Sequence, residues 1–314
     1  MGREAESCTV FAPATVANVG VGFDVLGFAI AAAGDTVRVT RRTERGAVVE
    51  SVSGVVPELP TEADRNTASV ALQALADDLG LTYGFGIEVD KGIPLGSGMG
   101  GSAASAVGAV VAGNGLLDRP LPRERLLAYA LEGERVASGA PHADNAAPCL
   151  YGGLTALVAD NPPRIVSIPV PAELRIVLVH PHRRIDTRDA RAVLRTEIGL
   201  REHVEQSMRL CGFLVGCFNG DLELIGESLQ DRIVEPQRSR LIEGFDAAAA
   251  AASGAGALGF GIAGSGPSVF ALCADDGAAA SVRAAVTEAF REQSIDSDGW
   301  VSSIDAGGAA VVGS

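Results

Sequence analysis

Apolar residues along this chain alternate between short runs at strand spacing and longer stretches at helical spacing. Residues 66–79 and 126–136 show the helical spacing and predict two helices. Short apolar runs in the first half predict strands at 8–14, 37–40 and 85–89. The second half predicts strands near 174–180, 259–262 and 268–273 and helices near 189–195, 202–218 and 222–227. This mixture indicates an α+β fold.

The length of the chain and an interruption in this pattern predict two domains. The chain has 314 residues, and domains usually hold roughly 100–200 residues. Glycines and prolines interrupt the pattern at 151–153 and 161–163, and it restarts with the strand predicted near 174–180. We therefore expect an N-terminal domain over residues 1–165 and a C-terminal domain over residues 166–314.

Charge and composition narrow the range of partners and locations. The 39 acidic residues outnumber the 25 basic ones and give a net charge of −14, so neither nucleic acid nor an anionic membrane is an expected partner. The uncharged runs 92–117 and 247–274 are rich in Gly, Ser and Ala, which is typical of buried elements rather than membrane helices. Five scattered cysteines without a CxxC pair, and a start without a secretory pattern, indicate a cytoplasmic protein.

A glycine-rich loop leads directly into a predicted helix of small residues over 102–117. It consists of Pro94, Leu95, Gly96, Ser97, Gly98, Met99, Gly100, Gly101 and Ser102. Glycines let backbone N–H groups turn toward an anion, and the helix directs the positive end of its dipole to the same place. The loop lacks the lysine of a Walker A motif, so backbone amides and a metal ion are expected to hold any phosphate. A tight turn before a packed helix explains the loop equally well.

Two further segments join this loop in a fixed order along the chain. Residues 13–24 read Pro-Ala-Thr-Val-Ala-Asn-Val-Gly-Val-Gly-Phe-Asp, and residues 261–268 read Gly-Ile-Ala-Gly-Ser-Gly-Pro-Ser. The three segments resemble the three signature motifs of the GHMP small-molecule kinases over essentially the whole chain. The first segment, together with Pro141-His142-Ala143-Asp144-Asn145, resembles the members that phosphorylate L-homoserine. The chain departs from the family at Gly101-Ser102, where two serines are usual.

The resemblance carries expectations about fold and activity. It implies a nucleotide-binding N-terminal domain, a ferredoxin-like C-terminal domain and an active site in the cleft between them. It also implies a homodimer and a transfer of phosphate from ATP, with Mg²⁺, to the hydroxyl of L-homoserine on the way to threonine.

The same resemblance implies roles for single residues. The residues implied for Mg²⁺ are Ser102 and Glu134, and Asn66 joins the loop 94–102 on the nucleotide. The residues implied on the substrate are Asn18, Asp24, His142, Asp144, Arg191 and Arg238, because a zwitterion needs an acceptor for its ammonium and a guanidinium for its carboxylate. The residues implied in positioning the hydroxyl are Asn145, Asp144 and Thr187. An amide cannot act as a general base, so Asn145 is expected to orient the hydroxyl rather than to deprotonate it.

Ordinary structural interpretations stand beside these roles. Glu134 fits a solvated helix face, Asn66 fits a helix N-cap, and Arg191 and Arg238 fit surface charges. His142 lies in a stretch, 138–145, that we expect to be a polar loop.

Other functions also remain open from the sequence. A GHMP kinase for another small alcohol, such as shikimate or mevalonate, would not need an ammonium acceptor at Asp24. A ligand sensor without catalysis would be expected to lose the metal pair of Ser102 and Glu134. A Rossmann dinucleotide site is disfavoured, because no GxGxxG segment follows an early strand with an acidic residue about twenty positions later.

Overall fold

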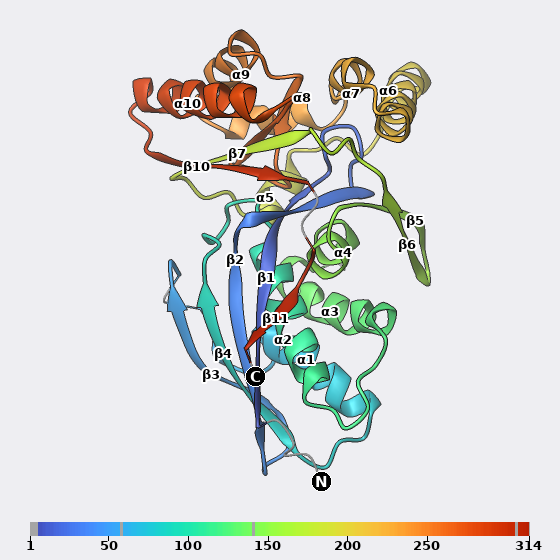
Figure 1. Ribbon diagram of the computed structural model, residues 1–314, viewed down its shortest axis with the longest axis vertical. Coiled ribbons are helices and arrows are strands. Elements are labelled where there is room, and N and C mark those ends of the chain that lie inside the picture. The colour runs from blue at the N-terminus through green and yellow to red at the C-terminus, as the bar shows by residue number, and fades with distance from the viewer. Residues whose placement is uncertain (1–5, 57–58, 140–141, 305–306, 314) are drawn as a thin grey trace.

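Two sheets, each covered by helices, organise the chain in a computed structural model that describes residues 6–56, 59–139, 142–304 and 307–313 (Figure 1). The larger sheet has the strand order β11-β1-β2-β4-β3, and β5 pairs with both β2 and β6. Its strands are β1 (Ser7–Ala17), β2 (Leu26–Arg42), β3 (Ala47–Gly54), β4 (Gly84–Lys91), β5 (Leu154–Asp160), β6 (Pro163–Ile168) and β11 (Ala310–Gly313). Only the β3–β4 pair is parallel among these described strands.

Helices of the first half cover one face of this sheet. They are α1 (Thr67–Asp78), α2 (Gly101–Gly115), α3 (Arg123–Ser138) and α4 (Ala143–Tyr151). Helix α2 is enclosed by the sheet and by α1 and α3, and its small residues permit that close packing. A Cβ on Gly108 would lie 2.6 Å from Val37, and one on Gly113 would lie 2.2 Å from Leu72. The uncharged run 92–117 is therefore a buried element, and no described helix is long and apolar enough to cross a membrane.

The second sheet is antiparallel, with the order β10-β7-β9-β8. Its strands are β7 (Arg175–Pro181), β8 (Gly259–Ile262), β9 (Val269–Cys273) and β10 (Ser297–Ser303). The helices of this part are α5 (Thr187–Ala192), α6 (Leu200–Asn219), α7 (Leu222–Ser228), α8 (Glu235–Arg238), α9 (Phe245–Gly254) and α10 (Asp276–Glu292), with a 3₁₀ turn at Ser239–Leu241. Numbered along the chain, the strands stand in the order 4-1-3-2, which is the ferredoxin-like arrangement that we expected.

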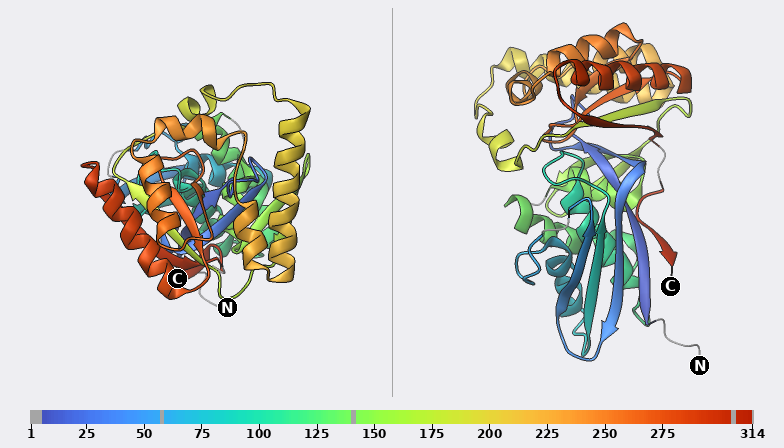
Figure 2. Two further views of the ribbon diagram at one scale, coloured as in Figure 1. Left: turned by 90° about the horizontal axis from the view of Figure 1, so that it is seen from above. Right: turned by 90° about the vertical axis from the view of Figure 1, so that its left-hand side faces the viewer.

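Strand β7 separates two hydrophobic cores. Ile176 and Leu178 belong to the core shared with the larger sheet, whereas Val177 and Val179 belong to a second core beneath α9 and α10. The layers are seen edge-on in Figure 2, where α9 and α10 lie on the outer face of the small sheet. Because the middle of this strand is buried on both faces, residues 176–179 are apolar without a break.

Most elements predicted from the pattern are present, and the differences have physical causes. Residues 143–145 form the first turn of α4 rather than a polar loop, with His142 as its N-cap. Helix α5 occupies Thr187–Ala192 instead of 189–195, because its polar, exposed face leaves little apolar periodicity to fix its ends. The pattern gave no prediction for β3, β5, β6, β10, β11 or for α8 to α10. The domain boundary at 165/166 stays a prediction.

Candidate active site

A cavity of about 640 Å³ lies between the two parts of the fold, lined by residues from 17–145 and from 184–265. It brings together nearly all residues that the sequence proposed for a site. Those that line it are Asn18, Asp24, Asn66, Pro94, Leu95, Gly96, Ser97, Gly98, Gly100, Gly101, Ser102, Glu134, His142, Asp144, Asn145, Thr187, Arg191 and Arg238. Met99 differs, because its side chain is fully buried in the hydrophobic core. Pro141 lies outside the described residues.

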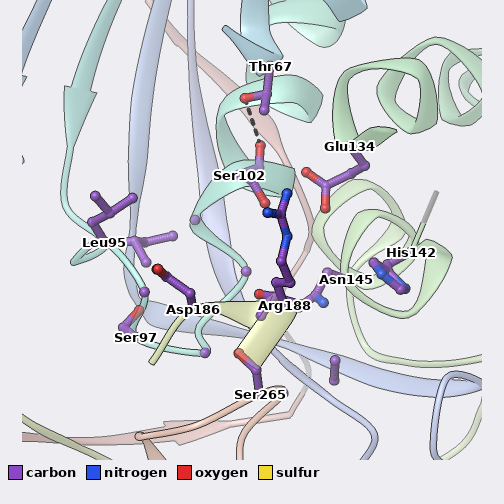
Figure 3. Close-up of a pocket in the computed structure, with 18 of the residues that line it drawn as sticks. Thr67, Leu95, Ser97, Ser102, Glu134, His142, Asn145, Asp186, Arg188 and Ser265 are labelled. Carbon is purple, nitrogen blue, oxygen red and sulfur yellow. Dashed lines mark hydrogen bonds between the residues drawn. The ribbon is translucent and has the colours of Figure 1, made fainter. Parts of the chain in front are cut away.

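The glycine loop takes a backbone course that side chains disfavour. Gly96, Gly98 and Gly100 have φ of 63°, 79° and 70°, in the left-handed region. A Cβ on Gly98 would lie 2.4 Å from the carbonyl oxygen of Ala263. Gly100 is the N-cap of α2 and offers no side-chain cap, so the first N–H groups of the helix remain available to an anion (Figure 3).

The glycine-containing segment 261–268 contacts this loop through Ser268. The backbone N–H of Ser268 donates to the carbonyl oxygen of Ser97 over 3.1 Å. The Ser268 hydroxyl in turn contacts Nδ1 of the buried His180 at 3.0 Å. Burial lowers the pKa of His180 to about 4, so this imidazole is neutral at physiological pH. The glycine-rich loop is thus held by a neutral hydrogen-bond chain from the second part of the fold.

The only lysine of the chain, Lys91, lies under the loop and was given no role from the sequence. Its Nζ contacts the carboxylate of Asp35 and donates to the carbonyl oxygen of Gly101 at 2.8 Å and to the Ser105 hydroxyl at 2.9 Å. Lys91 and Asp35 are both buried. Burial raises the pKa of Asp35, and Lys91 counteracts part of that rise. An ammonium has three N–H groups, so all three donors of Lys91 are in use.

Ser102 and Glu134 face the same space from α2 and α3 (Figure 3). Glu134 is only 3% exposed, so it does not occupy a solvated helix face, whereas its neighbour Glu132 is exposed. Burial raises the pKa of Glu134 to about 7, against the opposing effects of a hydrogen bond from Ser102 and the positive charge of Lys91. A hydroxyl and a buried carboxylate at this place are hard oxygen ligands of the kind that Mg²⁺ prefers.

At the other end of the cavity, Asp24 and Arg191 form a bidentate ion pair. Nη2 of Arg191 lies 2.9 Å from Oδ1 of Asp24, and Nη1 lies 3.1 Å from Oδ2. The ring of Phe23 supports two guanidinium groups, at 5.4 Å from Arg191 and 5.2 Å from Arg238. Each cation therefore lies within the range of a cation–π contact.

Arg238 is a buried site residue rather than a surface charge, with 3% exposure. Its Nε donates to the carbonyl oxygen of Ala190 at 3.1 Å, and its Nη1 donates to that of Gly264 at 3.0 Å. Asn18 donates to the same Gly264 oxygen at 2.8 Å and accepts from the N–H of Asp24. The segments 18–24 and 264–268 are joined through this carbonyl.

The first turn of α4 supplies three polar groups. Asp144 is 5% exposed, and its Oδ1 has no hydrogen-bond partner among the described residues. Burial, with the nearby charges of Asp24 and Glu134, raises the pKa of Asp144 to about 7. Burial and the charge of Arg191 lower the pKa of His142. Oδ1 of Asn145 accepts from the Thr15 hydroxyl at 2.7 Å, which fixes the orientation of the amide.

Asn66 lines the cavity and is also the N-cap of α1. Its side chain accepts from the N–H of Ala68 at 3.0 Å and donates to the carbonyl oxygen of Pro60 at 2.8 Å. The N-cap interpretation is confirmed, and the contact to adenine stays a prediction.

Several lining residues were not singled out from the sequence. They include Lys91 and the charged residues Arg184, Asp186, Arg188 and Asp189 around α5. Thr15, which donates to Asn145, and Asp35, which pairs with Lys91, do not line the cavity and were not singled out either. Lys91 could have been noticed in the sequence, because it is the only lysine in a chain whose other basic residues are arginines. The α5 residues carried none, since they lie in an exposed, polar stretch.

Comparison with known proteins gives a consistent picture. Residues 66–153 match the model of the GHMP kinases N terminal domain, and residues 213–292 match that of the GHMP kinases C terminal domain. A homoserine kinase of Xylella fastidiosa (strain 9a5c) is 46% identical, covering 98% of this chain and 95% of that protein. A homoserine kinase of Chlorobium phaeobacteroides (strain BS1) is 42% identical, covering 98% and 100%.

A solved structure agrees with these relatives. The crystal structure of homoserine kinase from Cytophaga hutchinsonii superimposes with a TM-score of 0.96 at 44% identity, and 99% of each chain is covered.

Proposed function

We propose that this chain, which belongs to the GHMP kinase family, transfers the γ-phosphoryl group of ATP to the hydroxyl of L-homoserine and forms O-phospho-L-homoserine for threonine biosynthesis. Relatives named homoserine kinase match it over nearly its whole length. The observation that carries the proposal is that one cavity holds both the glycine loop and the Asp24–Arg191 ion pair. The loop suits a nucleotide phosphate, and the ion pair suits a zwitterionic amino acid.

The nucleotide is assigned to the loop 94–102 and to Asn66. Gly96, Gly98 and Gly100 adopt the left-handed conformation, in which a Cβ would clash with neighbouring atoms, and their backbone lines the cavity. The N-terminus of α2 adds the positive end of its dipole. These groups bind and orient the phosphates, which is most of what a phosphoryl-transfer enzyme must do.

The residues fit Mg²⁺. Ser102 and Glu134 would hold it, and no three His, Cys, Asp or Glu side chains converge as a metal site within the described parts of the chain. A Mg²⁺ ion commonly takes one or two carboxylates and keeps several waters, so this sparse set suffices. When bound, Mg²⁺ neutralises charge on the phosphate oxygens.

The substrate is assigned to the opposite end of the cavity. Its ammonium would pair with Asp24 and with Oδ1 of Asp144, an acceptor that has no hydrogen-bond partner among the described residues. Its carboxylate would pair with Arg191 and Arg238, which Phe23 holds side by side. Asn18 and His142 would complete this end of the pocket. The substrate ammonium would therefore take the place of Arg191 beside Asp24, and the substrate carboxylate would take the place of Asp24 beside Arg191.

The substrate hydroxyl is assigned to Asn145, Asp144 and Thr187. Asn145 is held by Thr15, and Thr187 opens α5 on the facing wall of the cavity. No step requires an early loss of the hydroxyl proton, because phosphoryl transfer has a loose transition state in most analyses. Asn145 orients the hydroxyl, and the proton leaves with the product phosphate.

We assign the protein to the cytoplasm and propose that it forms a homodimer. Helix α6 supports the dimer, because it runs along the outer edge of the molecule (Figure 2). Its exposed side chains include an apolar stripe. The stripe consists of Leu200, Val204, Met208, Val215 and Phe218. Sedimentation should give twice the monomer mass, and Met208→Glu should halve it, whereas Val55→Glu, at an exposed apolar position in the turn after β3, should not. A wild-type monomer at micromolar concentration would refute the dimer.

The reaction is tested by measuring ADP release with ATP and Mg²⁺ while L-homoserine, shikimate and mevalonate are offered separately. Turnover with L-homoserine alone is the expected result. Glu134→Gln serves as the control for contaminating kinases, because it should remove most activity. Turnover with another alcohol would retain the kinase and reject the substrate. ATP binding without turnover on any alcohol would favour the sensor.

A further inference from the structure

The cations around the cavity differ in whether they have partners. All three donors of Lys91 are in use beneath the loop. Arg184 pairs with Asp186 at 2.8 Å, and Arg191 pairs with Asp24 at 2.9 Å. These charges are already neutralised or held in place. Arg65 lies 3.8 Å from Glu62, and Arg238 is bonded to two carbonyl oxygens.

Arg188 is the exception among the described residues that line the cavity. It is exposed, and its side chain makes no hydrogen bond, ion pair or ring contact to any described residue. It follows Thr187 in α5, and the segment just before this helix is joined to the glycine loop, because the N–H of Ile185 donates to the carbonyl oxygen of Gly96 over 3.0 Å. Figure 3 shows its guanidinium directed away from α5 toward Ser102, with Glu134 on the adjoining wall. An uncompensated guanidinium aimed at the N-terminus of α2 faces the place that we assigned to the nucleotide phosphates.

We propose that Arg188 is a further catalytic residue, which donates N–H groups to the γ-phosphoryl oxygens of ATP during transfer. The inference rests on the proposed function. As the hydroxyl oxygen of the substrate bonds to the γ-phosphorus, the bond from that phosphorus to the β–γ bridging oxygen breaks. ADP leaves with the electron pair of the broken bond, and the hydroxyl proton goes to the product phosphate.

The physical reason lies in the distribution of charge during this step. Negative charge on the transferring group and on the leaving oxygen must be met by donors that are already in place. The loop itself offers only neutral donors, namely backbone amides and the hydroxyls of Ser97 and Ser102, because Gly101 has no side chain. Lys91 is held by Asp35, so it cannot supply a free positive charge. Arg188 has the fixed fork of donors that suits phosphate oxygens.

The test compares Arg188→Ala, Arg188→Lys and Arg183→Ala. Arg183 is an exposed arginine five positions earlier that lies 3.6 Å from Glu243 and does not line the cavity, so it is the matched control. In Arg188→Ala, kcat should fall by roughly 10²- to 10³-fold. An arginine that stabilises the transferring phosphoryl group typically contributes about 10³-fold or more, and we expect a smaller effect here because Arg188 is exposed. The KM for L-homoserine should stay within about twofold, and Arg188→Lys should recover part of the loss, because it restores the charge but not the fork.

Binding measurements separate this role from a structural one. Arg188→Ala should bind ADP as the wild type does but bind AMP-PNP, a non-hydrolysable ATP analogue, about tenfold more weakly, the equivalent of one charge-assisted contact. Equal losses for ADP and AMP-PNP, or an unchanged kcat, would overturn the proposal while the reaction itself stands. If the wild type fails to turn over L-homoserine, the proposed function fails. The difference between ADP and AMP-PNP then still decides whether Arg188 faces the γ-phosphate.

Discussion

Replacing Asp144 with Asn should make the protein more stable above neutral pH while weakening its function. Burial and neighbouring negative charges raise the pKa of Asp144 from an ordinary 3.8 to about 7. Between these values the folded protein holds a proton that the unfolded chain has lost, so stability falls as pH rises and levels off above pH 7. A difference of about 3 pH units corresponds to about 4 kcal/mol lost at pH 8. Asn does not ionise and avoids this loss.

The effect can be read from urea unfolding followed by far-UV circular dichroism at pH 5 and pH 8. The gain in the free energy of unfolding for Asp144→Asn over wild type should grow by about 3 kcal/mol between these two pH values, since roughly 2 pH units of the titration lie between them. Asp189→Asn is the matched control, because Asp189 lines the same cavity but is exposed. That control should stay within about 0.5 kcal/mol of the wild type at both pH values.

Two results would refute this reasoning. A difference that does not depend on pH would mean that Asp144 ionises normally in the folded state. A variant less stable than wild type at pH 8 would mean that its carboxylate has a stabilising partner. The same variant should raise the KM for L-homoserine, because an amide oxygen still accepts from the ammonium but carries no negative charge to pair with it. An unchanged KM would remove Asp144 from the substrate site.

Three shorter predictions concern the loop, the metal and the hydroxyl. Gly98→Val should raise the KM for ATP by at least roughly tenfold, because its Cβ would lie 2.4 Å from the carbonyl oxygen of Ala263 and its φ of 79° disfavours a side chain; unchanged nucleotide binding in calorimetry would argue against the phosphate role. Glu134→Gln should raise the Mg²⁺ concentration needed for half-maximal activity by at least roughly tenfold, and a magnesium titration equal to that of Glu132→Gln would reject it as a ligand. Asn145→Ala should lower kcat by up to about 100-fold through misplacement of the hydroxyl, so near-wild-type turnover would remove that role.

Local rules predicted the α+β class and the glycine-rich loop, whereas the other candidate site residues were implied by the resemblance to the GHMP kinases. Glycines at 96, 98 and 100 were needed wherever the backbone takes the left-handed region, and these positions could be recognised without coordinates. The neighbourhood of Glu134 could not be recognised, because a carboxylate on a helix looks the same whether it faces water or a cavity. Its 3% exposure follows from how α3 packs against α1 and α2.

The sequence by itself determined the alternation of helices and strands and the glycine-rich course of the loop, because periodicity and glycine content act over a few residues. It also carried the order of the three motifs. Tertiary structure alone decided which charged side chains have an ion-pair partner and which do not. Lys91 is neutralised by Asp35, which is 56 residues away along the chain, and Arg191 is paired with Asp24, 167 residues away. Arg188, only three positions before Arg191, has no such partner among the described residues. Pairing depends on distances in space, and those distances are fixed only when β7 and α5 are packed against the first half of the chain.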